Sequence, residues 1–282
     1  MSLPLAYFHQ PANNHWLKMH VDFFALFFLP YAFREVFTFH EVYMEYYFID
    51  LKLRWSDAQQ YCREHYTDLA TVSNVEDLGR LTTPSAYTGH AWIGLIDDPA
   101  SWKQVMGNDS NSWRWSATGT TSPGGIQKWH SDEPNNNNGN NYCVYIKGGL
   151  WADAWCGHLK PFACFTGTPH QSSQRFTLVT AQMSWEDARI HCRQHHTDLA
   201  MIEAEAEFNT VASLYPSTHV WVGLYREPWR WSDGSQAKFT NWANGQPDNY
   251  QFNQHCVKVD NSRGWHDENC QASLPFHCEK GG

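Results

Sequence analysis

The feature that most constrains this chain is an internal repeat with four cysteines in each copy. A run beginning at Trp55 recurs at Trp185, and the Trp-Ile-Gly-Leu run at Trp92 recurs as Trp-Val-Gly-Leu at Trp221. The eight cysteines fall at matching places in the two copies. Long copies that each carry their own cysteines predict two homologous domains rather than a solenoid of short repeats.

The repeat divides the 282 residues into four segments. We predict an N-terminal segment over 1–43, a first domain over 44–165, a linker over 166–174 and a second domain over 175–280. The linker is rich in Gly, Thr, Pro and Ser, which is typical of connecting segments. Two domains also suit the chain length, at about 100–200 residues each.

The N-terminal segment contains an apolar run from Val21 to Phe33. It is shorter than the roughly 20 residues that a membrane-spanning helix needs, and its length suits the apolar core of a signal peptide. The alternatives are a misassigned start or an uncleaved anchor. Because no apolar span follows Cys278, we expect no membrane anchor at the C-terminus.

Each copy has a mixed pattern of strands and helices. Residues 45–49 and 175–179 predict opening strands, because they are rich in aromatic and β-branched residues. Trp55, Ala58 and Cys62 have helical spacing, as do their counterparts in the second copy. Helix starts are predicted at Ser184-x-x-Asp187 and Ser73-x-x-Glu76. Further strands are predicted over 142–146 and 255–259, after long polar loops.

Composition excludes some functions and favours an oxidising compartment. The net charge is −9 and the sequence shows no basic stripe, so a nucleic-acid partner is not expected. No Cys-x-x-Cys pair occurs, which argues against a zinc ribbon or a thioredoxin-type motif. The even cysteine count in two matched sets favours four disulfides over free cytosolic thiols.

One loop in each copy gathers side-chain oxygens. Glu133-Pro134-Asn135 in the first copy and Gln246-Pro247-Asp248 in the second copy each place oxygen-bearing side chains on both sides of a proline. Each copy then adds an aspartate near a tryptophan, Asp153 and Asp267, between two cysteines. Several oxygens directed at one point are what a hard cation such as calcium requires.

This pattern resembles the C-type lectin-like domain, twice in tandem, and is most similar to domains of the mannose-receptor group. The resemblance rests on the Trp-Ile/Val-Gly-Leu strand, the cysteine spacing, the two Pro-containing triplets and the Trp-x-Asp before the third cysteine. It implies an α+β fold in which each domain has two helices, small antiparallel sheets and a long disulfide-tied loop region. It also implies four disulfides: Cys62–Cys164, Cys143–Cys156, Cys192–Cys278 and Cys256–Cys270.

The resemblance also assigns candidate calcium ligands, which in sugar-binding members contact the sugar hydroxyls as well. In the first copy these are Glu133, Asn135, Asn141 and Asp153, with a mannose-type triplet. Asn141 replaces an expected glutamate, and Ala152 replaces an expected asparagine. Both changes weaken the predicted site, because calcium takes six to eight oxygens.

The second copy has a galactose-type triplet, Gln246 and Asp248, together with Gln254 and Asp267. Gln254 replaces the glutamate, and His266 replaces the asparagine; imidazole suits transition metals better than calcium. Tyr250 is a candidate for the apolar face of the sugar, as is Phe252, although a core role for both is an equal alternative.

The sequence therefore predicts an extracellular, secreted, glycan-binding protein of innate-immune type with weakened calcium sites. The alternative is a calcium-independent, protein-binding pair of lectin-like modules; ice binding is a third class implied by the resemblance alone. No nucleophile, zinc-protease or phosphate-loop motif is present, so an enzyme is not expected. Asn108 begins a glycosylation sequon. Trp92 and Trp221 are expected in the core, and Trp129 and Trp242 are expected to support the loops.

Overall fold

The structure is a computed structural model. It describes most of the chain: residues 44–103, 106–107, 109, 111–121, 125–171, 175–214 and 219–281. The expected signal peptide within 1–43 and the expected glycosylation site at Asn108 lie outside these residues. Within the described residues, no helix is long and apolar enough to cross a membrane.

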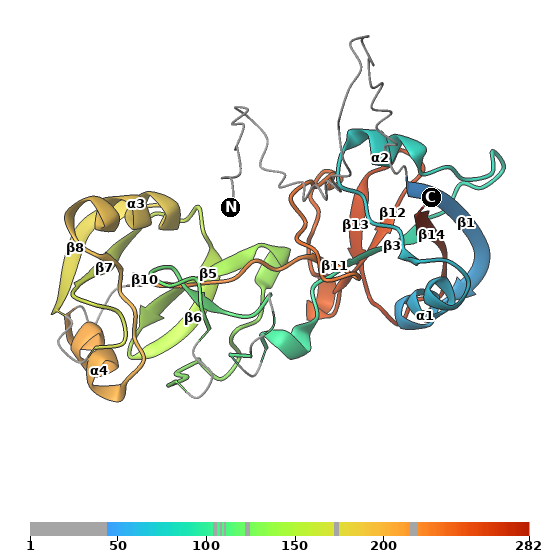
Figure 1. Cartoon of the computed structure of the whole chain (residues 1–282). Helices are drawn as coiled ribbons and strands as arrows, with labels where there is room; N and C mark the ends of the chain where they lie inside the picture. The colour runs from blue at the N-terminus through green and yellow to red at the C-terminus, as the bar shows by residue number, and fades with distance from the viewer. Residues whose placement is uncertain are drawn as a thin grey trace, which may run out of the picture. The chain divides into compact units, whose positions relative to one another are not determined.

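Two sheets organise the fold, and helices lie beside each of them (Figure 1). The strand order of the first sheet is β1 (Met44–Leu53), β14 (Leu274–Gly281), β3 (Ala91–Ile96), β12 (Cys256–Val259) and β13 (Trp265–Glu268). Two short strands extend it: β11 (Arg230–Trp231) pairs with β3, and β2 (Asp68–Leu69) pairs with β14. Only β14 and β3 pair in parallel.

The second sheet repeats this arrangement. Its order is β6 (Leu150–Trp155), β5 (Asn141–Lys147), β10 (Val220–Tyr225), β7 (Lys160–Thr166) and β8 (Arg175–Met183). The short strands here are β4 (Arg114–Trp115), which pairs with β10, and β9 (Asp198–Leu199), which pairs with β7. We call the first sheet with α1 (Trp55–His65) and α2 (Val75–Arg80) lobe A, and the second sheet with α3 (Trp185–His195) and α4 (Glu205–Leu214) lobe B.

Each lobe combines strands from both sequence copies. In lobe A, β3 from the first copy pairs with β12 from the second; in lobe B, β10 from the second copy pairs with β5 from the first. In Figure 1 the blue β1 and the dark red β14 accordingly lie side by side, although they come from opposite ends of the described chain. The two copies have exchanged halves, a form of domain swapping within one chain.

The exchange corrects two of the expected disulfides. The structure has Cys62–Cys278 and Cys164–Cys192 in place of Cys62–Cys164 and Cys192–Cys278. The expectation was wrong because the copies present nearly identical partner strands, so the spacing within one copy cannot decide which copy supplies the second cysteine. The two inner disulfides, Cys143–Cys156 and Cys256–Cys270, agree with expectation.

The segment expected as a linker connects neighbouring strands of one sheet. Thr166 at the end of β7 pairs with Arg175 at the start of β8, and both strands belong to lobe B. The chain crosses between the lobes elsewhere, after β3 and again after β10. The two sequence copies and the two folded lobes therefore do not coincide.

The helices form where their apolar residues face the sheets. Trp55, Ala58 and Cys62 of α1 are buried, as the helical spacing predicts. Helix α3 begins at Ser184, whose hydroxyl accepts a hydrogen bond from the Asp187 backbone at 3.2 Å, as expected.

The start of α2 differs by one residue from the prediction. Asn74 caps it by accepting from the Asp77 backbone at 2.8 Å, where the sequence suggested Ser73. Asn and Ser are comparably good N-caps, so the choice between adjacent candidates depends on the backbone.

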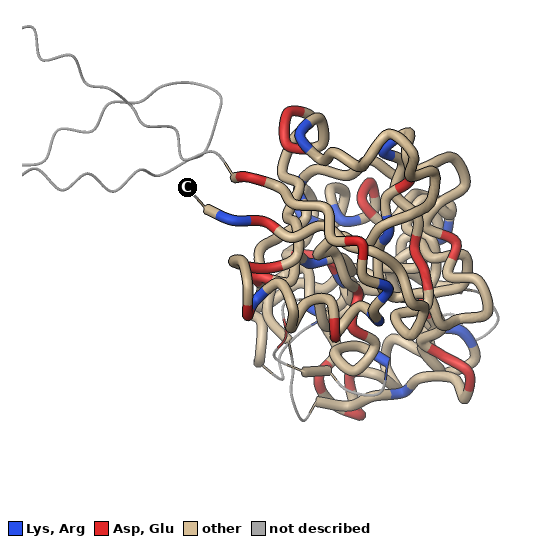
Figure 2. The backbone as a smooth tube through the Cα atoms, turned by 90° about the vertical axis from the view of Figure 1, so that its right-hand side faces the viewer, with Lys and Arg blue, Asp and Glu red and all other residues tan. Residues whose placement is uncertain are grey.

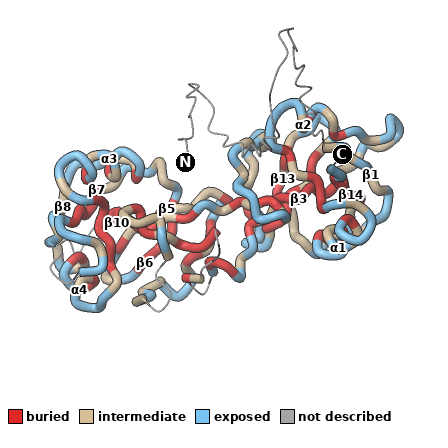
Figure 3. The backbone as a smooth tube through the Cα atoms, in the orientation of Figure 1, coloured by how far each residue is buried: buried red, intermediate tan, exposed pale blue. Residues whose placement is uncertain are grey.

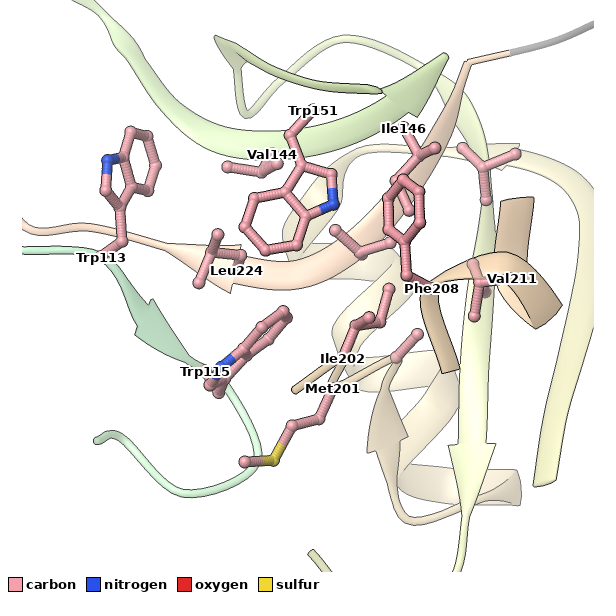
Figure 4. Close-up of a cluster of buried hydrophobic side chains, with 14 of the residues drawn as sticks. Trp113, Trp115, Val144, Ile146, Trp151, Met201, Ile202, Phe208, Val211 and Leu224 are labelled. Carbon is pink, nitrogen blue, oxygen red and sulfur yellow. The ribbon is translucent and has the colours of Figure 1, made fainter. Parts of the chain in front are cut away.

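The core of lobe B shows how completely the two copies interlock. Trp115, Val144 and Trp151 from the first copy pack with Phe208 and Leu224 from the second (Figure 4). Buried segments run through the strands of both lobes, and much of the helix surface is exposed (Figure 3). Burying one such aromatic side chain removes about 150–250 Å² from water and contributes up to roughly 4–6 kcal/mol.

The residues expected in the core are there. Trp92 and Trp221 are fully buried. Trp129, which was expected to support the loop of the first copy, packs against Trp113 and Trp151. Trp242 packs against Trp229 and Trp265 in the same way in lobe A.

Candidate functional site

The first candidate site lies in lobe B, on the loop from Glu133 to Asn141 (the Glu-Pro-Asn loop). The Glu133–Pro134 peptide bond is cis. Asp153 in the middle of β6 holds the loop in place: its carboxylate accepts from the backbone N–H of Asn135 at 3.1 Å and of Asn136 at 2.7 Å. A rigid strand thus positions this carboxylate.

The four residues predicted as ligands in the first copy line one hollow. It has a volume of about 430 Å³, and Glu133, Asn135, Asn141 and Asp153 are all on its wall. The sequence had suggested their convergence, and the geometry brings them together around one space.

The two carboxylates in this hollow face each other. Burial, a hydrogen bond with Asp153 and the negative charge of Asp153 raise the pKa of Glu133 far above its usual range. Two carboxylates at close range repel when both are ionised, and a bound cation would relieve that repulsion. The residues present therefore fit a cation, with Asn135 and Asn141 as amide donors beside the carboxylates.

Other residues of the hollow were not predicted from the sequence. Tyr145, Trp155, Lys160 and His219 also line it, and the Trp155 side chain is exposed. The Lys160 ammonium lies 4.6 Å from the centre of the Tyr145 ring. The His219 ring stacks on the same Tyr145 ring, with centroids 4.7 Å apart. His219 carries no local signal, because it comes from the other sequence copy. Trp155 could have been found from its place next to the inner cysteine.

The second candidate site lies in lobe A, on the loop from Gln246 to Gln254 (the Gln-Pro-Asp loop). Its backbone repeats the first one: the Gln246–Pro247 bond is cis. The Asp267 carboxylate accepts from the backbone N–H of Asp248 at 3.0 Å and of Asn249 at 2.7 Å. Burial raises the pKa of Asp267 to about 6, the two backbone hydrogen bonds oppose that rise, and the charge of Asp248 adds to it.

The side-chain oxygens of this second loop bond to the protein itself. The Gln246 carbonyl oxygen accepts from the Asp267 backbone at 3.2 Å, and the Gln254 oxygen accepts from the Tyr250 backbone at 2.8 Å. Both Asp248 oxygens also accept hydrogen bonds, one from Gln246 and one from Tyr250. A calcium ion would have to compete with these donors. The same holds in the first loop, where oxygens of Glu133, Asn135 and Asp153 accept backbone hydrogen bonds.

Two details of the second loop decide between earlier alternatives. Tyr250 is 65% exposed and Phe252 is 50% exposed, so the core role is wrong for both. The His266 side chain contacts Asp260 instead of the candidate calcium ligands: its Nε2 lies 2.9 Å from the Asp260 carboxylate.

The two loops also contact each other. The Asn249 side chain donates to the Asn136 carbonyl oxygen at 3.0 Å. Gly139, with a φ of +66°, lies so close to Pro247 that an added Cβ would approach the Pro247 carbonyl within 2.7 Å. Both the left-handed backbone and the space therefore require glycine here.

Comparisons with known proteins assign both sequence copies to one family. The family model described as "Lectin C-type domain" matches residues 51–166 and 181–280, more than half of the chain. "C-type lectin lectoxin-Lio1" of Erythrolamprus poecilogyrus is 31% identical over 129 residues, covering 41% of this chain and 79% of that protein. Human "Lymphocyte antigen 75" is 24% identical over 265 residues, covering 82% of this chain and 15% of that protein.

A mannose receptor and a solved lectin domain are also similar. Human "C-type mannose receptor 2" is 34% identical over 106 residues, covering 35% of this chain and 7% of that protein. The mouse scavenger receptor C-type lectin carbohydrate-recognition domain is 15% identical with a TM-score of 0.37, over 84% of this chain and 90% of that chain. The family consists of carbohydrate-binding domains that are not enzymes. Because the family model matches more than half of its residues, the chain belongs to the C-type lectin domain family.

Proposed function

We propose that the hollow in lobe B binds a mannose-type sugar through calcium. Glu133, Asn135, Asn141 and Asp153 would hold the ion, and the same oxygens would bond two neighbouring sugar hydroxyls. The observation that carries the proposal is the pair of facing carboxylates, Glu133 and Asp153, on the wall of one hollow with both amides.

Trp155 supports a sugar as the occupant. It lines the same hollow and is 49% exposed. An exposed aromatic ring offers a flat apolar surface to the carbon face of a sugar, while polar side chains bond its hydroxyls. The described chain intersperses acidic and basic residues (Figure 2), which suits a neutral glycan better than a polyanion.

Four disulfides among the described residues support an extracellular location, because such bonds persist in oxidising compartments. We therefore propose a secreted protein that meets glycans outside the cell. A role in innate immunity would follow from which glycans it recognises.

The test is thermal unfolding of the disulfide-bonded protein in millimolar calcium and then in chelator. Calcium at 100 times its dissociation constant stabilises the fold by about 2.7 kcal/mol. For a unit of this size, that raises Tm by roughly 5–11 °C. Glu133→Gln should abolish the shift, whereas the matched change Asp248→Asn in the other triplet should leave it in place. No shift in the unchanged protein would sink the calcium mechanism.

The variant Ala152→Asn restores the ligand that the first site lacks, whereas Glu133→Gln removes one. Ala152 borders a second hollow, of about 410 Å³, that also contains Glu133. An asparagine there has room to present an amide oxygen toward the Glu133 carboxylate. We expect tighter calcium binding, measured by titration calorimetry; an unchanged affinity would show that the remaining ligands do not form a shell.

A second function, calcium-independent protein binding, is favoured by the Gln-Pro-Asp loop. It presents two aromatic side chains, Tyr250 and Phe252, to solvent. Exposed aromatics are enriched in protein interfaces. The triplet order would suit galactose if the loop bound calcium, with Tyr250 on the apolar face of the sugar. Columns of immobilised mannose and galactose, each eluted with chelator, separate these outcomes. Retention of the protein on galactose would assign this loop to sugar binding, and no retention on galactose would favour protein binding.

A further inference from the structure

Three side chains outside the candidate calcium sites converge on one face of lobe A. They are His90, which precedes β3; Asp260, which follows β12; and His266 on β13. One ligand atom from each lies within 4.8 Å of the others, and all three side chains are partly buried.

The strand register explains this convergence. Ala91 pairs with Val259, so the next residues outward, His90 and Asp260, lie opposite each other. His266 pairs with Lys258, which is two residues before Asp260 in the chain. Because alternate residues of a strand point to the same face, His90, Asp260 and His266 share one face of the sheet.

Neighbouring contacts hold this cluster in position. The Asp260 carboxylate lies 2.9 Å from Nε2 of His266 and accepts from the Gly264 backbone, also at 2.9 Å. The rings of His90 and His266 meet edge to face, with centroids 5.2 Å apart. The nearby cation of Lys258 is paired with Glu268 at 2.7 Å. Such outer contacts orient metal ligands in proteins.

We propose that His90, Asp260 and His266 bind a divalent transition-metal ion of the zinc type. Two imidazoles and one carboxylate are a zinc donor set, and three protein ligands leave a fourth position open for water or an external ligand. Zinc–ligand bonds of about 2.0–2.2 Å place neighbouring ligand atoms about 3.3–3.6 Å apart, so small side-chain rotations bring the cluster to that geometry. Calcium is not the expected ion, because imidazole is a poor ligand for it.

The site depends on the exchange of halves. His90 comes from the first sequence copy, whereas Asp260 and His266 come from the second. The residue that matches His90 in the second copy is His219, which stacks on Tyr145 in lobe B. If each copy folded on itself, His219 would take the place beside Asp260 and His266.

The experiment is a titration of the metal-stripped, disulfide-bonded protein with zinc, and with cobalt as a spectroscopic substitute. We expect one site with a dissociation constant below about 10 µM and the visible absorption of tetrahedral cobalt. His90→Ala and Asp260→Asn should each weaken binding at least about tenfold. The matched change His219→Ala should leave zinc affinity unchanged. Circular dichroism checks that each variant is folded. If His90→Ala does not fold, Asp260→Asn is the variant that tests the site.

Three results would overturn the proposal. The first is no zinc binding in this affinity range. The second is loss of binding in His219→Ala with binding retained in His90→Ala. The third is loss of binding in His191→Ala, which would place the ion at the neighbouring rings of His191 and His195 on α3 instead.

Discussion

A buried ion pair lies where the chain crosses between the two lobes. Asp97 follows β3 and Arg226 follows β10, at matching positions of the two copies. Their side chains meet at 2.7 Å, and their exposed fractions are 1% and 0%. The Arg226 guanidinium also lies 4.1 Å from the centre of the Trp102 ring. Matching positions with opposite charges can pair only if the two copies come together.

Replacing Arg226 by Met should therefore destabilise the fold strongly. Removing one partner of a buried pair leaves an uncompensated charge and costs about 3–5 kcal/mol. For a unit of this size, that lowers Tm by roughly 6–20 °C. The pair has only one direct bond: Oδ2 of Asp97 and Nε and Nη2 of Arg226 have no hydrogen-bond partner among the described residues. The double variant Arg226→Met/Asp97→Asn should therefore recover most of the loss.

The assay is a double-mutant cycle from urea unfolding curves, followed by tryptophan fluorescence with the disulfides intact. Arg189→Met is the matched control, because Arg189 pairs with Glu186 on the exposed face of α3; exposed pairs contribute only about 0–1 kcal/mol. A cost below about 1 kcal/mol for Arg226→Met, or equal costs for the single and double variants, would refute a buried pair at the crossover.

Three further predictions concern the disulfides and pH. A non-reducing digest should yield Cys62 linked to Cys278 and Cys164 linked to Cys192; peptides joining Cys62 to Cys164 would contradict the exchange. Replacing both Cys143 and Cys156 by Ser should lower the free energy of unfolding by about 3 kcal/mol, because their disulfide closes a short loop. The same change should weaken calcium binding; an unchanged calcium affinity would mean that the disulfide does not shape the hollow. Burial lowers the pKa of His277 from 6.5 to about 4, so the unfolded chain binds the proton first and stability falls as pH drops from about 6.5 to 4. His277→Phe should reduce that fall by up to about 3 kcal/mol, seen as a smaller drop in the urea midpoint than in the unchanged protein.

Local structure was largely predictable from the sequence. The buried face of α1, the cap at Ser184 and the opening strands depend on residues close together in the chain, and short-range rules describe them. The candidate ligands of the first copy were also predictable, because the Glu-Pro-Asn loop and β6 come from the same half of the repeat. The internal bonding of the Gln-Pro-Asp oxygens was not, because it depends on backbone geometry that a motif does not contain.

What the sequence by itself determined is the set of parts: two copies, four cysteines in each, and two loops rich in oxygen ligands. What only the tertiary structure decided is which halves pair. The strands that contain Trp92 and Trp221 are so similar in sequence that their local pattern does not say which copy completes which sheet. The copies differ where they meet at Asp97 and Arg226, matching positions that carry opposite charges and pair in this arrangement. Such contacts join residues that are far apart in the chain, so no local pattern reveals them.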